Sequence, residues 1–375
     1  MSETNKAPYA KTRKILAIVF IAIFLLLIFL FPILWICGVP AGDNFENREP
    51  AKAPEFGELF TDYGNFASKF EKYYNDAIPF RSGIMSVYSY LNYKWFNISV
   101  VPKVTSVGKH GWLFYEDFNT RNVISGDFML TQDQLDYIYQ GITAKYEALK
   151  KLGKSYVVYI APEKQSVYPE YDRLRNSDYT CAEQLLAYLA EKNCPATVIY
   201  GKNLLLEKKN GETVLYYKYD SHWNAVGGFY AYRQLIDEVR KLVDKDFPVV
   251  DDGDYTIQTE KYENADLATV LTLTRKLTEN AHSVKYNAPI TATYQTVDER
   301  LTVAKSDTDS DLKVFLYGDS FSDKRFWGEC FLRSANEVRF LHNRNDFATL
   351  LGYAEDCDVV IEECVARVLT TLGNS

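Results

Sequence analysis

The residues from 15 to 36 form an apolar run without a single charged side chain. At the rise of an α-helix, a run of this length covers the roughly 30 Å of hydrocarbon in a lipid bilayer. Three cations precede the run and three carboxylates follow it: Lys11, Arg13 and Lys14, then Asp43, Glu46 and Glu49. Because positive charge favours the cytoplasmic side, we expect a cytoplasmic tail at residues 1–14, a transmembrane anchor at 15–36, and the rest outside the cytoplasm.

The run could instead belong to a cleaved signal peptide or to a lipoprotein signal. A cleaved signal peptide has a shorter apolar core and small residues at its cleavage site, and Val39-Pro40-Ala41-Gly42 is only a weak match. A lipoprotein signal needs small residues just before Cys37, where Trp35 and Ile36 stand. The sequence therefore favours an anchor that is not cleaved.

The part of the chain beyond the anchor is acidic. The first fourteen residues carry a net charge of +3 and the whole chain carries -8, so the remainder carries -11. Nucleic-acid binding needs basic patches that face the phosphates, and this charge argues against it. With 375 residues, 47% of them hydrophobic, the chain can bury a substantial core.

Six cysteines are spread along the chain without a C-x-x-C pair: Cys37, Cys181, Cys194, Cys330, Cys357 and Cys364. With only four histidines beside them, this spacing predicts no metal site. One cysteine borders the membrane, which leaves an odd number beyond it, so we favour buried free thiols over a fully paired disulfide framework. A bridge from Cys181 to Cys194 stays open as an alternative.

Residues 43–109 form an aromatic-rich juxtamembrane region. Within it, apolar residues recur at helical spacing from Phe66 to Ile78, and Pro79 ends the expected helix. The aromatic side chains are explained either by packing at the edge of a subdomain or by a surface that faces sugars. We expect one large domain to follow at residues 110–375.

That domain alternates between amphipathic helical segments and short β-rich runs. Capping boxes at Thr131 and Gln134 and at Thr180 and Glu183 begin two helices, and Asn224 caps a third. The β-rich runs lie at 155–160, 196–200, 313–317, 338–341 and 358–361. Strands separated by helices predict an α/β fold, in which a parallel sheet has helices on both faces.

Two short stretches supply the residue types of a nucleophilic site. Asp220 and His222 are two positions apart, and in an extended chain their side chains project to the same side. Ser320 follows the β-rich run at 313–317, and ligands of such sheets bind at the carboxyl ends of the strands. A serine becomes nucleophilic when a histidine removes its proton and a carboxylate orients that histidine. We therefore predict that Ser320, His222 and Asp220 form a catalytic triad.

The surroundings of Ser320 fit this role. Gly318 permits a tight turn, and a helix expected from Phe321 to Ser334 would point backbone N–H groups at an oxyanion. Each stretch alone also has a plainer explanation, because Gly-Asp-Ser is common in turns and Ser320 could merely cap that helix. Asp220 and His222 could likewise be a helix-start carboxylate beside a surface histidine.

The order of several short motifs resembles the SGNH/GDSL-hydrolase-like sugar O-acetyltransferases of the alginate-acetylation type, also called the DHHW family. The likeness runs from about residue 46 to 370. It is carried by Glu46-Asn47-Arg48, Gly111-Trp112-Leu113-Phe114, Pro162-x-Lys164, Tyr168-Pro169-Glu170, Asp220-x-His222-Trp223, Asp266-Leu267-Ala268 and Gly318-Asp319-Ser320-Phe321. In that family the Asp-x-His element is the orienting acid and base and the Gly-Asp-Ser serine is the nucleophile. The resemblance thus implies these roles for Asp220, His222 and Ser320. This chain departs from the family at Ser221, where the four-letter motif has histidine.

The resemblance implies a three-layer α/β/α SGNH-hydrolase-like domain. It also implies an enzyme outside the cytoplasm that moves acetyl groups onto a cell-surface or secreted polysaccharide through an acetyl-serine. Together with the anchor expected at 15–36, this predicts a single-pass protein of the bacterial plasma membrane. No cofactor is expected, and a membrane-bound O-acyltransferase partner would supply the acetyl group. The candidate substrate-binding residues are Trp223, Tyr317 and Arg344. Two alternatives stay open: a carbohydrate acetylesterase with the same triad, and a non-enzymatic glycan-binding scaffold.

Overall fold

The computed structural model describes residues 7–42, 49–209, 212–297, 300–342 and 347–374. These residues divide into two compact units, Met1–Leu91 and Asn92–Ser375. The Glu46-Asn47-Arg48 motif lies outside the described residues.

The N-terminal unit is helical and contains α1 (Ala7–Ile36), α2 (Glu58–Thr61), α3 (Tyr63–Ala77) and α4 (Arg81–Leu91). Within α1, the segment Thr12–Ile36 is long and apolar enough to cross a membrane, and a signal sequence would have the same character. The helix predicted from Phe66 to Ile78 is α3, which begins after Asp62, whose side chain accepts from the Asn65 N–H. Trp35 at the end of α1 packs edge-on against Tyr74 of α3, with ring centroids 5.4 Å apart.

The second unit is built around a seven-stranded sheet in the order β4-β3-β11-β9-β10-β8-β7. Its strands are β3 (Ser155–Ala161), β4 (Thr197–Tyr200), β7 (Ala292–Thr296), β8 (Leu301–Ser306), β9 (Lys313–Gly318), β10 (Glu337–His342) and β11 (Val359–Val365). The strands from β4 to β10 are parallel, whereas β8 is antiparallel to both β10 and β7. The predicted parallel α/β sheet is therefore confirmed, with an antiparallel edge that the sequence did not reveal.

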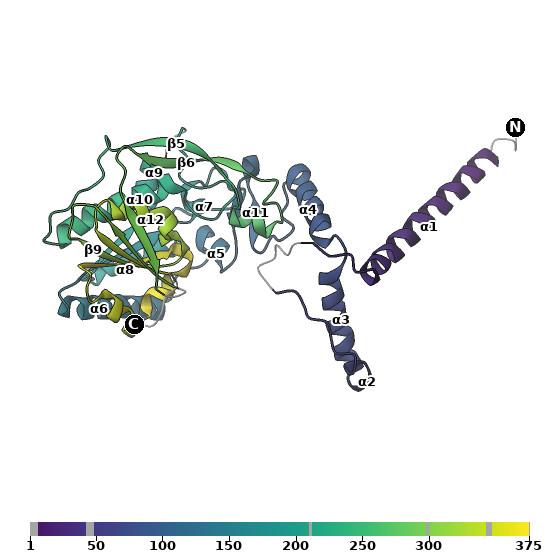
Figure 1. Cartoon of the computed structure of the whole chain (residues 1–375), viewed down its shortest axis with the longest axis horizontal. Coiled ribbons are helices and arrows are strands. Elements are labelled where there is room, and N and C mark those ends of the chain that lie inside the picture. Colours follow the sequence, from purple (N-terminus) through teal and green to yellow (C-terminus); the bar gives the residue numbers. More distant parts are fainter. Residues whose placement is uncertain (1–6, 43–48, 210–211, 298–299, 343–346, 375) are drawn as a thin grey trace. The chain divides into compact units, whose positions relative to one another are not determined.

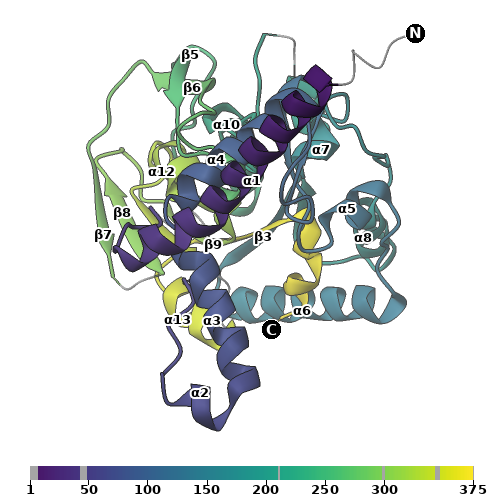
Figure 2. The ribbon, with the colours of Figure 1, turned by 90° about the vertical axis from the view of Figure 1, so that its right-hand side faces the viewer.

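Helices cover both faces of this sheet. The α-helices of this unit are α5 (Thr120–Ser125), α6 (Gln132–Lys151), α7 (Lys164–Val167), α8 (Cys181–Glu191), α9 (Lys202–Lys208), α10 (Ala225–Leu242), α11 (Asp266–Val270), α12 (Lys324–Leu332) and α13 (Phe347–Ala354), as far as its residues are described. Alternate residues of β3 face opposite ways: Val157 and Tyr159 pack with apolar residues of α10 and α12, and Tyr156 and Val158 pack with those of α6, α8 and α13. The result is a three-layer α/β/α arrangement, with α10 and α12 on one side of the sheet and α6 on the other (Figures 1 and 2).

Two small antiparallel pairs lie outside the main sheet. One joins β1 (Thr105–Val107) to β2 (Leu113–Tyr115), and the other joins β5 (Tyr255–Tyr262) to β6 (Glu279–Tyr286). The Gly111-Trp112-Leu113-Phe114 motif leads into β2, whereas the β5–β6 pair was not predicted. Figure 1 shows this pair beyond α10 and α9, away from the sheet.

The cysteines are free thiols in this structure, and four of them are buried: Cys181, Cys330, Cys357 and Cys364. Cys181 and Cys194 are not bridged. The structure therefore favours the buried thiols over the alternative disulfide.

Candidate active site

Ser320 lies at the carboxyl end of β9, in the middle of the sheet, where it begins a short 3-10 turn, Ser320–Ser322. Asp319 fixes this turn, because its Oδ1 accepts from the Phe321 N–H (3.0 Å) and its Oδ2 accepts from the Val365 N–H (2.8 Å) at the end of β11. The predicted helix from Phe321 to Ser334 is wrong at its start. Helix α12 begins only at Lys324, because Asp323 caps it by accepting from the Arg325 N–H at 2.8 Å. The N-terminus of α12 is thus already occupied by a carboxylate of the chain.

Gly318 is required at the end of β9 by close packing. Its φ is not positive, so the expected tight turn is not the reason for glycine. A Cβ at this position would lie 2.7 Å from both the Glu363 carbonyl oxygen and the Ser322 Oγ, well inside van der Waals contact. The glycine therefore lets β11 and the serine turn approach each other.

Asp220 and His222 lie in a bend before α10 and not in an extended strand. The Asp220 Oδ1 accepts from the His222 backbone N–H at 3.1 Å, and the same oxygen is 2.6 Å from the His222 Nδ1. A carboxylate that bonds to the backbone two residues on is an Asx-turn, a local arrangement typical of aspartate. The expected pairing of the two side chains is present, but the bend produces it.

The structure brings the three predicted triad residues together. The His222 Nε2 lies 2.6 Å from the Ser320 Oγ, although the two residues are 98 positions apart. Asp220 is 1% exposed and His222 is 6% exposed, so water has little access to the bond between them. A carboxylate at Nδ1 favours the tautomer with its proton there, which leaves Nε2 free to accept from the serine hydroxyl.

The second oxygen of Asp220 has its own two donors. The Tyr262 hydroxyl donates to Oδ2 at 2.9 Å and the Asp266 backbone N–H donates at 3.0 Å. Tyr262 is the last residue of β5, and its ring stacks on Tyr217 at 3.8 Å between centroids. Burial alone would raise the pKa of Asp220, but its hydrogen bond with His222 and the backbone donors hold that pKa well below its usual range. Asp220 therefore stays a carboxylate.

Ser221 connects a second carboxylate to this group. Its hydroxyl donates to the Asp266 Oδ2, its N–H donates to the Asp266 Oδ1 at 2.7 Å, and its Oγ is 3.3 Å from the His222 Nδ1. The Asp266 Oδ2 is itself 3.6 Å from that ring nitrogen. Burial, and then the charge of Asp220, raise the pKa of Asp266. The sequence marked Asp266 only through the Asp266-Leu267-Ala268 motif and gave no role to Tyr262.

Lys164 holds the loop that carries Asp220. Its Nζ donates to the Asp220 carbonyl at 2.6 Å and to the Tyr217 carbonyl at 3.0 Å. The cation is buried near the rings of Trp112 and Phe114, whose centroids are 5.7 and 5.2 Å from the Nζ. Burial lowers the pKa of Lys164 to about 8. The motifs that contain Lys164, Asp220 and Trp112 therefore meet around this one loop.

Comparison with known proteins identifies the family. Residues 105–338 match the family described as "SGNH hydrolase-like domain, acetyltransferase AlgX", which is more than half of the chain. The chain belongs to the AlgX family of SGNH hydrolase-like acetyltransferases.

Solved structures resemble this AlgX-family chain over 71% of its length. Bacillus cereus PatB1 is 13% identical, with a TM-score of 0.52 over 97% of its own chain, and supports the fold. The O-acetyltransferase domain of Pseudomonas putida AlgJ is 18% identical, with a TM-score of 0.47 over 92% of its chain. A DHHW family protein from Eubacterium siraeum is 12% identical, with a TM-score of 0.48 over 95% of its chain. A comparison of the sequence with curated proteins found no match.

The AlgX-family domain does not present the predicted substrate-binding residues as expected. Trp223 is 0% exposed and packs against Phe321 and Trp327, with ring centroids 5.0 and 5.7 Å away. Tyr317 is 2% exposed and belongs to the apolar core on the other face of the sheet. Tyr317 faces inward because it continues the alternation of β9, and Trp223 because it packs among the aromatic side chains of the other core, so the structure gives neither a surface for a sugar. Arg344 lies outside the described residues.

A buried ion pair that the sequence did not suggest lies beside the serine turn. The Arg367 Nη1 is 2.9 Å from both carboxylate oxygens of Glu163, and the guanidinium lies over the Tyr115 ring at 4.6 Å. Although burial would lower the pKa of Arg367, the charge of Glu163 raises it. Arg367 also lies 5.9 Å from the Phe321 ring, next to Ser320. Its position after β11 carries no sequence signal that separates it from other arginines.

Two triad residues and Asp266 together offer atoms of the kind that bind metals. Asp220, His222 and Asp266 offer ligand atoms that all lie within 4.8 Å of one another. Two ligands on one tetrahedral zinc ion, each 2.0–2.1 Å from it, would be roughly 3.3 Å apart. The 2.6 Å between the His222 Nδ1 and the Asp220 Oδ1 is shorter, and is the length of a hydrogen bond.

Proposed function

We propose that this chain is a membrane-anchored O-acetyltransferase that works outside the cytoplasm and moves acetyl groups onto a polysaccharide through a Ser320–His222–Asp220 triad. The observation that carries the proposal is the imidazole of His222, with Asp220 2.6 Å from one nitrogen and Ser320 2.6 Å from the other. Membership of an acetyltransferase family supplies the group that is transferred.

The first half of the reaction loads the serine. The Ser320 Oγ attacks the carbonyl carbon of an acetyl ester or thioester while the His222 Nε2 takes the hydroxyl proton. The resulting oxyanion lies near the backbone N–H of Ser320, and such donors contribute about 3 kcal/mol each. The leaving group departs with the proton from His222, and an acetyl ester remains on Ser320.

The second half transfers the acetyl group to a sugar. A sugar hydroxyl attacks the serine ester while His222 takes its proton, and the proton then returns to the Ser320 Oγ as the bond to serine breaks. Asp220 stabilises the imidazolium in both halves and does not take up a proton itself. The low pKa of Asp220 supports this assignment.

The N-terminal helix supports a place at the membrane. We interpret the apolar run at 15–36, within Thr12–Ile36, as an uncleaved anchor, because it is longer than the core of a signal peptide and is followed by only a weak cleavage site. The cations before this run and the carboxylates after it favour a catalytic domain outside the cytoplasm. Acetyl-CoA is not expected outside the cytoplasm, so we expect a membrane-bound O-acyltransferase partner to deliver the acetyl group, as the family resemblance suggests.

A Ser320→Ala variant of the full-length protein tests the proposal. We expect acetyl transfer from a chromogenic acetyl ester to a glycan to fall by at least about a hundredfold, which is typical of losing a triad nucleophile. Undiminished transfer would contradict the triad, whereas a wild-type protein that neither turns over the ester nor acetylates the glycan would favour the scaffold alternative. If the wild type releases acetate at the same rate with or without glycan, and no glycan is acetylated, the protein is an esterase.

A further inference from the structure

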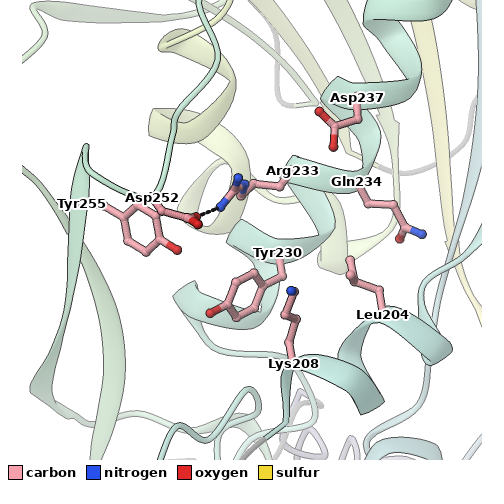
Figure 3. A pocket seen from close by; sticks show the side chains of 8 residues that line it. All are labelled: Leu204, Lys208, Tyr230, Arg233, Gln234, Asp237, Asp252 and Tyr255. Atoms are coloured by element: carbon pink, nitrogen blue, oxygen red, sulfur yellow. Dashed lines mark hydrogen bonds and ion pairs between the residues drawn. The ribbon is translucent and has the colours of Figure 1, made fainter.

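A polar cavity of about 410 Å³ lies in the catalytic unit between α9, α10 and the start of β5. Figure 3 shows Tyr255 and Asp252 on one side of this cavity, with Gln234 and Asp237 on the other. Tyr230 and Lys208 lie between them. The triad residues do not line the cavity, so the mechanism above leaves it unused. Its volume is in the range of pockets that hold small organic ligands.

Two tyrosines give the cavity rigid ring surfaces. Tyr230 and Tyr255 are both half-buried and both pack on Phe229, with ring centroids 5.9 and 4.5 Å from it. Aromatic rings fixed in this way offer apolar faces together with a hydroxyl. Sugars present complementary groups, since their C–H faces are apolar and their edges carry hydroxyls.

The charges of the lining are balanced. Arg233 and Asp252 form a hydrogen-bonded ion pair, which Figure 3 marks with a dashed line. The hydrogen bond from Arg233 lowers the pKa of Asp252. Lys208 and Asp237 contribute one more charge of each sign. A cavity without net charge has no preference for a polyanion, while its carboxylates, cations and the Gln234 amide provide donors and acceptors for hydroxyl groups.

Two rigid elements join this cavity to the triad. Helix α10 begins at the Asn224 cap, two residues after His222, and reaches Arg233 after roughly 14 Å along its axis. Strand β5 begins at Tyr255 in the cavity and ends at Tyr262, whose hydroxyl donates to Asp220, over about 23 Å. The cavity is therefore held at a fixed distance from Ser320, a distance that several linked sugar units would cover.

We propose that this cavity binds a neutral, hydroxyl-rich sugar unit of the acceptor polysaccharide, at a site separate from the acetylation centre. The inference rests on the proposed function, and it adds the class of acceptor and a second point of attachment. Holding a long chain here raises the effective concentration of its other hydroxyls at Ser320. Short acceptors that cannot reach both places gain nothing from it.

Binding can be measured without catalysis. Full-length protein carrying Ser320→Ala, in detergent micelles, is titrated by calorimetry with three neutral hexasaccharides, namely cellohexaose, maltohexaose and the hexamer of N-acetylglucosamine, and with a polyuronate hexasaccharide. We expect at least one neutral hexasaccharide to bind, and Tyr230→Ala to weaken its Kd about tenfold or more. Tyr230→Phe keeps the ring and should retain binding. Tyr179→Ala, at a tyrosine that is 52% exposed and outside the cavity lining, is the matched control.

A second variant separates loss of binding from misfolding of Tyr230→Ala. Asp237→Ala changes an exposed residue of α10, and we expect it also to weaken binding while far-UV circular dichroism stays unchanged. The inference is overturned if no neutral hexasaccharide binds, if the polyuronate binds more tightly, or if both cavity variants bind like the Tyr179→Ala control.

The two proposals fail separately. In protein with Ser320 intact, Tyr230→Ala should leave hydrolysis of a small chromogenic acetyl ester unchanged and lower acetyl transfer only to long acceptors. If the protein binds no oligosaccharide but turns over the ester normally, the cavity proposal fails and the proposed function stands. Ester turnover that survives Ser320→Ala would refute the triad and would leave the binding result intact.

Discussion

At the scale of single residues, the two oxygens of Asp220 have different partners. Oδ1 is hydrogen-bonded to the ring Nδ1 and to the backbone N–H of His222. Oδ2 accepts from the Tyr262 hydroxyl and from the Asp266 backbone N–H. A carboxylate with all these donors is fixed in orientation before substrate arrives. That fixed orientation is what a histidine base requires of its acid partner.

Tyr262 is therefore expected to act as a positioning residue. In Tyr262→Phe the hydroxyl is lost and the ring stack on Tyr217 is kept, so we expect kcat to fall roughly ten- to a hundredfold, as for one hydrogen bond to a charged group. KM should stay unchanged, because the hydroxyl reaches Asp220 and not the substrate. Steady-state kinetics with a chromogenic acetyl ester measure both constants.

Tyr294→Phe, at a tyrosine of β7 that is 47% exposed, is the control for this change and should leave both constants as they are. A purely structural role for Tyr262 would instead lower the amount of active protein and leave the kcat of the folded fraction unchanged.

The sequence revealed some of these residues and not others, for physical reasons. Asp220 and His222 are close in the chain, so their pairing depends only on local geometry. Ser320 could be added because its strand and turn place it at the carboxyl edge of a sheet. Tyr262 is 42 positions from Asp220, and its contact depends on the β5–β6 pair, which has no apolar alternation to announce it. Trp223 and Tyr317 have the residue types of sugar platforms, but only packing shows that they are buried.

At the scale of elements, the serine turn depends on the close approach of β9 and β11. Gly318→Ala would place a Cβ 2.7 Å from the Glu363 carbonyl and the Ser322 Oγ. We expect the unfolding free energy to fall by about 1–3 kcal/mol, typical of overpacking, and kcat to fall because the turn shifts Ser320. Chemical denaturation and ester turnover measure the two effects.

Gly253→Ala is the matched control, because among the described residues no atom beyond the glycine and its two chain neighbours lies within 4 Å of the Cβ that it would add. Equal stability and turnover for both alanine variants would show that the packing around Gly318 is not restrictive.

Lys164 ties α7 to the Asp220 loop and should give stability a pH dependence. Burial lowers its pKa to about 8 from the ordinary lysine value of 10.5. Between these two pH values the unfolded chain binds a proton that the folded chain does not, so folded-state stability rises with pH. Denaturation of wild type and Lys164→Met at pH 7 to 10.5 should show the wild type gaining up to about 3 kcal/mol relative to the variant. Parallel profiles would contradict a buried cation at this position.

The elements with strong local signals were predicted and the others were not. Both capping boxes, at Thr131 and Thr180, and the Asn224 cap are present where expected. Strands β7 and β8 were missed because they form an antiparallel edge of the sheet and several of their side chains are exposed, so they lack the apolar run of a buried strand. The turn after Ser320 was read as helix because Asp323, the true cap, follows only three residues later.

At the scale of the whole molecule, an acidic body follows an apolar helix that cations precede. We expect the full-length protein to be found in the membrane fraction at its full length, and a version without residues 1–42 to be released from it. Fractionation with an antibody against the C-terminal part checks both. A soluble, shortened product from the full-length gene would mean that the helix is a cleaved signal sequence.

The central claim is that Ser320 carries the acetyl group between donor and acceptor. Full-length wild-type protein is mixed with a chromogenic acetyl ester without sugar, quenched in acid at early times, digested and examined by mass spectrometry. We predict one acetyl group on the peptide that contains Ser320, absent from Ser320→Ala and removed from the wild type when acceptor glycan is added. An enzyme that turns over the ester while Ser320 stays unmodified, or that carries the acetyl group on another residue, would contradict the account.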